Sequence, residues 1–203
     1  MSIQEPKIID VNEPIEETVP IKLVVLGKSL VGKSALTYRF ISDKFPTEHD
    51  TTVEDQYKTV ITVNDKSCEL EILDTAGQDD YQTMLDTWID FGNCFLLVYA
   101  IDDMDSFKQI KFKYDRICQN KKDEKISVVI VGNKCDLEDS KRKVSKNEAE
   151  NLGKNLGVTF LEVSALKRVN VKEAFTQVVH EYLSKQKKKK HHENNVAGGC
   201  PCF

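Results

Sequence analysis

Short apolar runs alternate along this chain with segments whose apolar residues recur every three or four positions. The apolar runs are typical of strands buried on both faces, and they cover residues 21–26 (IKLVVL), 94–100 (CFLLVYA), 126–131 (ISVVIV) and 158–163 (VTFLEV). The periodic segments predict helices, one of them carrying Phe107, Ile110, Tyr114 and Ile117 on a single face. The alternation predicts an α/β domain with a mostly parallel sheet and helices on both faces.

Residues 55–74 depart from this alternation. Two β-rich runs flank Asn64-Asp65-Lys66, a turn-forming sequence that favours a hairpin. We therefore expect six strands, one of them antiparallel at the edge of the sheet. Helix starts are also visible, because Ser145 and Glu148 have the spacing of a capping box and Asn170 with Glu173 has the same spacing.

Composition and charge divide the chain into three parts. Its 203 residues are 40% hydrophobic and 31% charged, as in one soluble globular domain. The net charge of −4 hides two ends of opposite charge. Residues 1–20 hold five acids and one base, Lys7, whereas residues 185–192 hold five lysines and two histidines without an acid. We expect a flexible acidic leader over 1–20, the domain over 21–184 and a polybasic tail over 185–203.

The cysteines and the longest apolar runs bear on the compartment. The six cysteines lack the density of a disulfide scaffold and the spacing of a zinc site, so a reducing compartment is favoured. Apolar runs fall short of the roughly 18 residues that span a bilayer. The N-terminus carries acids where a signal peptide would be apolar.

The strongest motif is Gly27-x-x-x-x-Gly32-Lys33-Ser34, which follows the first apolar run. This is the P-loop pattern in its required context of strand before and helix after, where successive backbone N–H groups cradle phosphates. Lys33 would reach the outer phosphates and the Ser34 hydroxyl would ligate Mg²⁺. The residues expected to line the phosphates are Ser29, Leu30, Val31, Gly32, Lys33, Ser34 and Ala35.

A second motif, Asp74-Thr75-Ala76-Gly77-Gln78, ends the second run of the hairpin. An acid at the tip of a strand can hold Mg²⁺ through water, and we assign Asp74 to this role. Gly77 can bring a backbone N–H close to a γ-phosphate, because no Cβ stands in the way.

Two further motifs follow later strands and favour guanine. Asp136, in Asn133-Lys134-Cys135-Asp136, can accept hydrogen bonds from guanine N1–H and its 2-amino group, donors that adenine lacks. Ser164-Ala165 can present a backbone N–H to guanine O6. Both motifs follow strands of the predicted sheet, at the edge where open α/β folds bind ligands.

Taken together, GKSLVGKS, DTTVED, DTAGQ, NKCD and SAL resemble, in this order, the small GTPases of the Ras superfamily, and Leu73 favours the Ras branch. The resemblance covers about residues 21–183 and implies a P-loop NTPase G domain that binds GTP or GDP with Mg²⁺. It implies nucleotide contacts from Phe45, beside guanine, and from Asn133, Lys134, Asp136, Ser164, Ala165 and Leu166. Thr52 would bind Mg²⁺ in the GTP state, and Gln78 would orient the attacking water, with Lys33 and Gly77 as its catalytic partners.

The resemblance also implies partners. Effectors would bind Glu54, Asp55 and Tyr57 beside an edge strand, and an exchange factor would release GDP. A GTPase-activating protein would have to supply an arginine, because none of the four arginines of this chain falls within 43–55 or 74–85. We expect no nucleic-acid partner.

The C-terminus predicts an anchor. Cys200-Pro201-Cys202-Phe203 has the form of a prenylation box with Cys200 as the lipidated residue, and the lysines before it would bind anionic lipid. We expect the protein to lie on the cytoplasmic face of a membrane, and the plasma membrane is the favoured one.

Ser29 and Leu30 stand where Ras proteins commonly carry glycines. The Cβ and hydroxyl of Ser29 would enter the space that Gln78 and an incoming arginine share, which predicts slow hydrolysis and a weak response to activators. A serine small enough to be tolerated is the alternative. Two other functions stay open, a GTP-loaded scaffold with negligible turnover and a P-loop kinase, although the arginine-rich lid of such kinases is missing from the sequence. Trp88 is expected in the core or on a partner surface.

Overall fold

The computed structural model describes residues 18–45, 54–77, 84–122 and 124–196, with side chains as far as Lys187. Within these ranges the chain forms one six-stranded sheet in the order β2-β3-β1-β4-β5-β6. Its strands are β1 (Val19–Gly27), β2 (Glu54–Val63), β3 (Lys66–Thr75), β4 (Cys94–Ala100), β5 (Ser127–Asn133) and β6 (Thr159–Glu162). Every neighbouring pair is parallel except β2 and β3, which confirms the predicted fold class.

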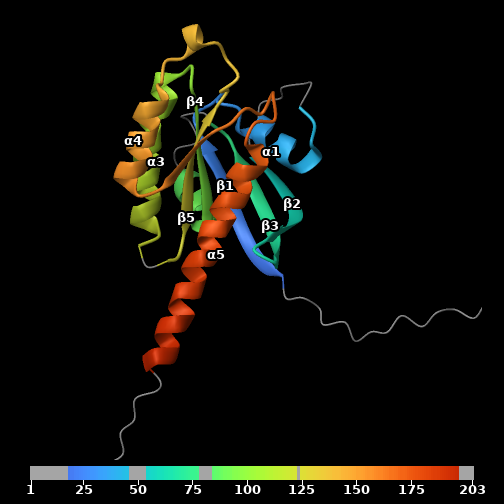
Figure 1. Cartoon of the computed structure of the whole chain (residues 1–203), viewed down its shortest axis with the longest axis vertical. Coiled ribbons are helices and arrows are strands. Elements are labelled where there is room, and N and C mark those ends of the chain that lie inside the picture. Colours follow the sequence, from blue (N-terminus) through green and yellow to red (C-terminus); the bar gives the residue numbers. More distant parts are fainter. Residues whose placement is uncertain (1–17, 46–53, 78–83, 123, 197–203) are drawn as a thin grey trace, which may run out of the picture.

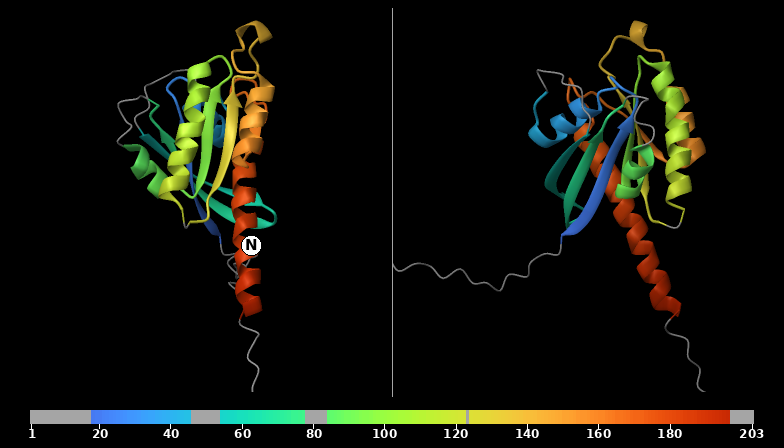
Figure 2. Two further views of the ribbon diagram at one scale, coloured as in Figure 1. Left: turned by 90° about the vertical axis from the view of Figure 1, so that its left-hand side faces the viewer. Right: turned by 180° about the vertical axis from the view of Figure 1, so that it is seen from behind.

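Helices cover both faces of this sheet (Figure 1 and Figure 2). The helices of the described residues are α1 (Lys33–Ser42), α2 (Leu85–Phe91), α3 (Met104–Asn120), α4 (Lys146–Leu156) and α5 (Val171–Val196), with a 3-10 turn at Asp139–Lys141. One hydrophobic core lies between the sheet and helices α1 and α5. The other lies between the sheet and helices α2, α3 and α4.

Strand β1 shows why residues 23–26 of its sequence are all apolar. Leu23 and Val25 belong to the core under α1 and α5, whereas Val24 and Leu26 belong to the opposite core. Because successive side chains of a strand point to opposite faces, a strand between two helical layers needs apolar residues at every position.

The local predictions of turns and caps had different outcomes. Strands β2 and β3 form the expected hairpin, whose two-residue turn places Asn64 and Asp65 at φ of 52° and 58°. Ser145 and Glu148 form the expected capping box on α4. Asn170 instead donates its side-chain amide to the Glu162 carbonyl oxygen at 2.8 Å, so the polar residue before α5 ties this helix to the end of β6.

The last helix continues into the basic tail. Helix α5 runs from Val171 to Val196, and its far end projects beyond the sheet (Figure 1). Lys185 donates to the Ile126 carbonyl oxygen at 2.9 Å, which holds the helix to the start of β5. Among the described helices, none has the length and apolarity needed to cross a membrane.

Candidate nucleotide-binding site

The P-loop is a short connection between the end of β1 and the first turn of α1. Gly32 caps α1 with φ of 90°, and a Cβ at this position would lie 2.5 Å from Asn133 Nδ2. Asn133 donates from this nitrogen to the Val31 carbonyl oxygen at 2.8 Å. The conformation and the close approach both require glycine, so the motif glycine has a structural reason here. Ser29, Leu30 and Val31 stand in the loop, and Ser34 and Ala35 in the first turn of α1.

Lys33 lies in this first turn with only 6% of its surface exposed. Its ammonium donates to the Lys28 carbonyl oxygen at 3.2 Å. Burial lowers the pKa of Lys33 to about 8, although the nearby carboxylate of Asp74 works in the opposite direction. A poorly solvated cation beneath a loop of backbone N–H groups favours a bound anion.

Asp74 is the penultimate residue of β3 and lies near this lysine. It is fully buried, and neither carboxylate oxygen has a hydrogen-bond partner within the described part of the chain. Burial raises its pKa to about 6, while the Ser34 hydroxyl and Lys33 are near enough to oppose that rise. Because buried carboxylates are otherwise paired or bound to metal, this arrangement fits a Mg²⁺ ion held by Ser34 and, through water, by Asp74.

The donor set would be completed by groups other than carboxylates. The described residues contain no group of three His, Cys, Asp or Glu side chains able to hold a metal ion alone. Mg²⁺ usually takes one or two protein ligands plus phosphate oxygens and water, so a hydroxyl beside one buried acid is the pattern expected for a metal bound with a nucleotide.

Gly77 packs directly on the P-loop. A Cβ on Gly77 would lie 2.5 Å from the carbonyl carbon of Lys28 and 2.5 Å from Lys33 Nζ, and it would also collide with the backbone nitrogen of Ser29. Only glycine permits this approach. The structure therefore brings the predicted γ-phosphate residue against the part of the P-loop that carries Ser29.

The guanine motifs meet the P-loop from the other side. Asn133 accepts from the Ala165 backbone N–H at 3.2 Å, so the N–H expected at guanine O6 is used within the protein. The Ser164 hydroxyl donates to the Asp136 carboxylate and orients it. Lys134 has φ of 67° and pairs with Asp102 at 3.3 Å. These contacts join the loops after β1, β5 and β6 into one pocket rim.

Leu166 and Phe45 stand at the side of this rim. Leu166 is 51% exposed, whereas Phe45 packs partly against the core under α1. Arg39 of α1 lies between them, with its guanidinium carbon 5.7 Å from the centre of the Phe45 ring. Sequence reasoning missed Arg39, because one arginine in a helix carries no local signal of its contacts.

Two other contacts were not anticipated. Lys28, inside the P-loop, pairs with Asp103 at 3.0 Å, and Asp103 also caps α3. Trp88 lies in the core, and its indole N–H donates to Glu54 at 2.7 Å. The acid of Asp103 one residue before a helix is a detectable capping signal, but nothing in the sequence links Trp88 to Glu54.

The remaining predicted residues divide into two groups. Glu54 and Asp55 are exposed and Tyr57 is half-buried on β2, at the edge of the sheet. Burial raises the pKa of the Tyr57 hydroxyl, with Asp55 acting in the same direction. Thr52, Gln78 and Cys200 lie outside the described residues.

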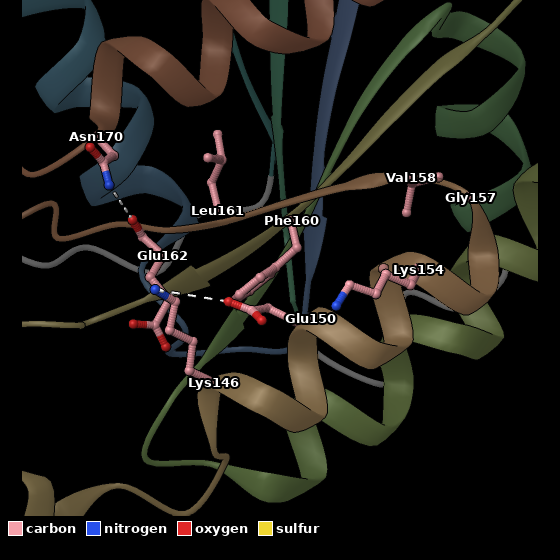
Figure 3. Close-up of a pocket in the computed structure, with 10 residues that line it drawn as sticks. Lys146, Glu150, Lys154, Gly157, Val158, Phe160, Leu161, Glu162 and Asn170 are labelled. Carbon is pink, nitrogen blue, oxygen red and sulfur yellow. Dashed lines mark hydrogen bonds and ion pairs between the residues drawn. The ribbon is translucent and has the colours of Figure 1, made fainter.

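A separate groove of about 440 Å³ lies between α4 and β6 (Figure 3). Its walls include Lys146, Glu150 and Phe160, and Lys146 pairs with Glu150 across 3.9 Å. None of the described residues that we expect to bind nucleotide lines it. The groove is therefore distinct from the pocket at the P-loop.

The fold and the pocket together define the class. A P-loop, a buried acid at the tip of β3 and an Asn-Lys-x-Asp motif at the end of β5 meet at the carboxyl edge of a mostly parallel sheet, as in the G domain of a small GTPase. The Ras family model matches residues 22–184, and the chain belongs to the Ras family of small GTPases. Proteins of this family bind GTP and GDP with Mg²⁺ and hydrolyse GTP.

Similar proteins include two from Dictyostelium discoideum. The Ras-like protein rasB is 44% identical over 178 residues, which cover 88% of this chain and 90% of rasB. The Ras-like protein rasS is 42% identical over 174 residues, which cover 86% of this chain and 89% of rasS.

Proposed function

We propose that this Ras-family GTPase is a membrane-anchored signalling switch that hydrolyses GTP slowly and recruits effectors in the GTP state. The observation that carries the proposal is the packing of Gly77 on the P-loop backbone at Lys28 and Ser29. The γ-phosphate and its Mg²⁺ would order Thr52 and Gly77, and hydrolysis would release both. Bound Mg²⁺, held by Ser34, Thr52 and Asp74, would neutralise charge on the phosphates.

Slow hydrolysis follows from the position of Ser29. Gln78 follows Gly77 directly in the sequence, and Gly77 approaches the backbone nitrogen of Ser29, so a side chain on Ser29 would stand near the residue that must orient the attacking water. For Ras itself, an arginine inserted by an activating protein accelerates hydrolysis by about 10³- to 10⁵-fold. An obstacle to Gln78 or to that arginine would remove part of this gain without weakening nucleotide binding.

Single-turnover GTP hydrolysis tests the role of Ser29. Wild type, Ser29→Gly and Ser29→Ala are each loaded with GTP and followed with and without an activating protein. We expect Ser29→Gly to respond at least tenfold more strongly to the activator, in line with the roughly 10³- to 10⁵-fold range of that step. Ser29→Ala separates the effect of the Cβ from that of the hydroxyl.

Two results would change the proposal. Equal activated rates in wild type and Ser29→Gly would remove Ser29 as the cause of slow turnover. Wild type that holds GTP without hydrolysis for its whole bound lifetime would favour the second candidate, a GTP-loaded scaffold, which the contact between Gly77 and the loop at Ser29 also supports.

Effector binding is proposed for strand β2. This strand forms the edge of the sheet, its outer backbone groups face away from β3, and Glu54 and Asp55 are exposed. A partner could add a strand there, with basic side chains opposite the acids. Effector domains that bind Ras proteins should prefer the GTP-loaded form, and Asp55→Lys should abolish that preference. Lys66→Glu, at the other end of the hairpin, is the control; equal loss in both would contradict binding at this end.

Membrane anchoring is proposed for the tail, through a prenyl group on Cys200 and the lysines of 185–190. One lipid chain alone binds marginally, whereas each lysine near an anionic surface adds about 1 kcal/mol. The prenylated full-length protein should bind vesicles containing phosphatidylserine and dissociate as salt rises. Cys200→Ser should stay in solution, and cell fractionation should place only the wild type at the plasma membrane. Equal vesicle binding by Cys200→Ser would contradict the lipid anchor.

A further inference from the structure

Each of the three guanidinium nitrogens of Arg39 donates to a backbone carbonyl oxygen. Nε donates to Ala165 at 2.9 Å and Nη2 donates to Leu166 at 3.0 Å. Nη1 donates to Asp43 at 3.0 Å. Three nitrogens of one side chain thus hold three carbonyl groups in two segments that are more than 100 residues apart in the chain.

These two segments carry Ala165 and Phe45, which are expected beside the guanine base, and we call them the two walls of the base pocket. Ala165 and Leu166 belong to the loop after β6, which also contains the Ser164 hydroxyl that orients Asp136. Asp43 ends α1 and leads into the segment that carries Phe45. Because Arg39 also lies over the Phe45 ring, it contacts both walls at once.

A second arginine links the same segments more weakly. Arg168 donates to the carboxylate of Asp43, but the two side chains are 62% and 55% exposed. Exposed pairs contribute little because water and salt screen them. Among the described residues, Arg39 is the better shielded connection between the two walls, because its bond to the Ala165 carbonyl oxygen is partly buried.

We propose that Arg39 is a positioning residue that closes the base side of the pocket and sets the rate of nucleotide release. This inference rests on the proposed nucleotide-binding function of the same pocket. Release requires the loop at Ala165 and the segment at Phe45 to separate, and separation breaks charge-assisted hydrogen bonds that are among the stronger ones in proteins. Arg39 acts at the base end, away from the hydrolysed phosphate.

The chemistry of the side chain makes the proposal specific to arginine. A guanidinium is planar and directs several N–H groups at fixed angles, so it can hold the Ala165, Leu166 and Asp43 carbonyls together. A lysine ammonium at the same position keeps the charge but lacks the planar set of N–H groups at fixed angles. Substitution by lysine should therefore rescue only part of the function.

The test measures release of a fluorescent GDP analogue from the full-length protein in excess Mg²⁺. Arg39→Ala should release GDP about tenfold to a hundredfold faster, since hydrogen bonds to charged groups are worth roughly 1.5–3 kcal/mol. A non-hydrolysable GTP analogue should leave faster by the same factor. Single-turnover hydrolysis of bound GTP should stay within about twofold of wild type, because the phosphate end is unchanged. The rate of GDP release from Arg39→Lys should fall between the rates of wild type and Arg39→Ala.

Arg116→Ala is the matched control. Its guanidinium also joins two elements, through bonds of 2.8 and 2.6 Å to Asp86, but these are α3 and α2. Release from this variant should equal that from wild type. Thermal unfolding of all variants in saturating GDP shows that each one is folded, and Arg39→Lys serves if Arg39→Ala does not fold.

Several outcomes would overturn the inference. Release of GDP from Arg39→Ala at the wild-type rate would do so. A wild-type release rate in Arg39→Lys would also do so, as would a loss of GTP hydrolysis in Arg39→Ala as large as its gain in release. Failure of the proposed function is separate, because it would appear as wild-type protein that takes up no guanine nucleotide. Uptake by wild type together with unchanged release from Arg39→Ala would reject the positioning role alone.

Discussion

The backbone conformation of Leu30 destabilises the P-loop. Its φ of 64° lies in the left-handed region, where a Cβ costs roughly 1–2 kcal/mol, and its side chain is 89% exposed. Glycine would remove the strain but would also make the unfolded chain more flexible. We therefore expect Leu30→Gly to stabilise the GDP-bound protein by about 0.5–1 kcal/mol in urea denaturation.

Leu30→Ala is the control for this prediction. Alanine removes the exposed side chain and keeps the Cβ, so it should leave the free energy of unfolding near that of wild type. An equal gain from alanine and glycine would show that the exposed side chain, and not the backbone, is responsible.

Asp74 destabilises the protein when metal and nucleotide are removed. Burial raises its pKa from 3.8 to about 6, so the folded state carries the cost of an ionised buried carboxylate. That cost is absent below about pH 4, grows as the pH rises towards the folded-state pKa and is complete above about pH 6. At pH 7 in EDTA, Asp74→Asn should raise the free energy of unfolding by up to about 3 kcal/mol, the value of two pKa units.

Adding ligand should reverse the sign. Wild type with Mg²⁺ and GDP gains stability from binding that the asparagine variant lacks in part. Thermal unfolding of both proteins in EDTA and in excess Mg²⁺ with GDP measures the two effects, and EDTA scans at pH 4.5 should show the difference reduced to about a third of its value at pH 7. A lower melting temperature of Asp74→Asn in both solutions would contradict the prediction.

At the scale of elements, one aspartate joins the P-loop to α3. Asp103 Oδ1 accepts from the backbone N–H groups at the start of α3, and Oδ2 pairs with Lys28 at 3.0 Å. The pair is about one-third exposed, so Lys28→Ala should lower the free energy of unfolding by no more than about 1 kcal/mol. Asp103→Ala should cost about 1 kcal/mol more, because the cap is lost as well.

Urea denaturation at two salt concentrations separates the pair from the cap. Asp103→Asn keeps a capping oxygen and loses the charge, so it should behave like Lys28→Ala. In 1 M NaCl, where the screening length is about 3 Å, the cost of Lys28→Ala should shrink and the extra cost of Asp103→Ala should remain. An Asp103→Asn variant as unstable as Asp103→Ala would contradict this division.

At the scale of the whole molecule, Trp88 can report the nucleotide state. It is the one tryptophan of the chain. Its indole N–H binds Glu54 at the start of β2, directly after the segment that contains Thr52, and α2 itself follows the segment that contains Gln78. Exchange of GDP for a GTP analogue should therefore change tryptophan emission. Glu54→Ala should reduce that change.

Glu71→Ala serves as the control, since Glu71 pairs with Lys58 on the same hairpin, whereas the Trp88 indole donates to Glu54. Its fluorescence change should match that of wild type. Identical spectra of the GDP and GTP-analogue forms of wild type would contradict a link between Trp88 and the nucleotide.

The accuracy of sequence reasoning differed between kinds of contact. Strands were readable because burial on both faces demands continuous apolar runs, as in β1 and β4. The hairpin turn and the α4 cap were readable because the residues that close them, Val63 with Lys66 and Ser145 with Glu148, are three apart in the chain. Asn170 shows the limit, because its side chain bonds eight residues back to Glu162 and does not act as the spacing suggested.

The amino-acid sequence by itself determined the P-loop and the guanine motifs, because each depends on an order of residues within one short segment, and the fold class, because each apolar run or helical period is local and their alternation can be followed along the chain. Only the tertiary structure decided that Arg39 reaches Ala165, 126 residues away, and that Trp88 binds Glu54 and Lys28 binds Asp103. Such contacts depend on how the sheet brings the ends of distant strands together. The Arg39 side chain bonds a backbone carbonyl, which places no demand on the residue type of the partner, so this contact leaves no pattern in the sequence.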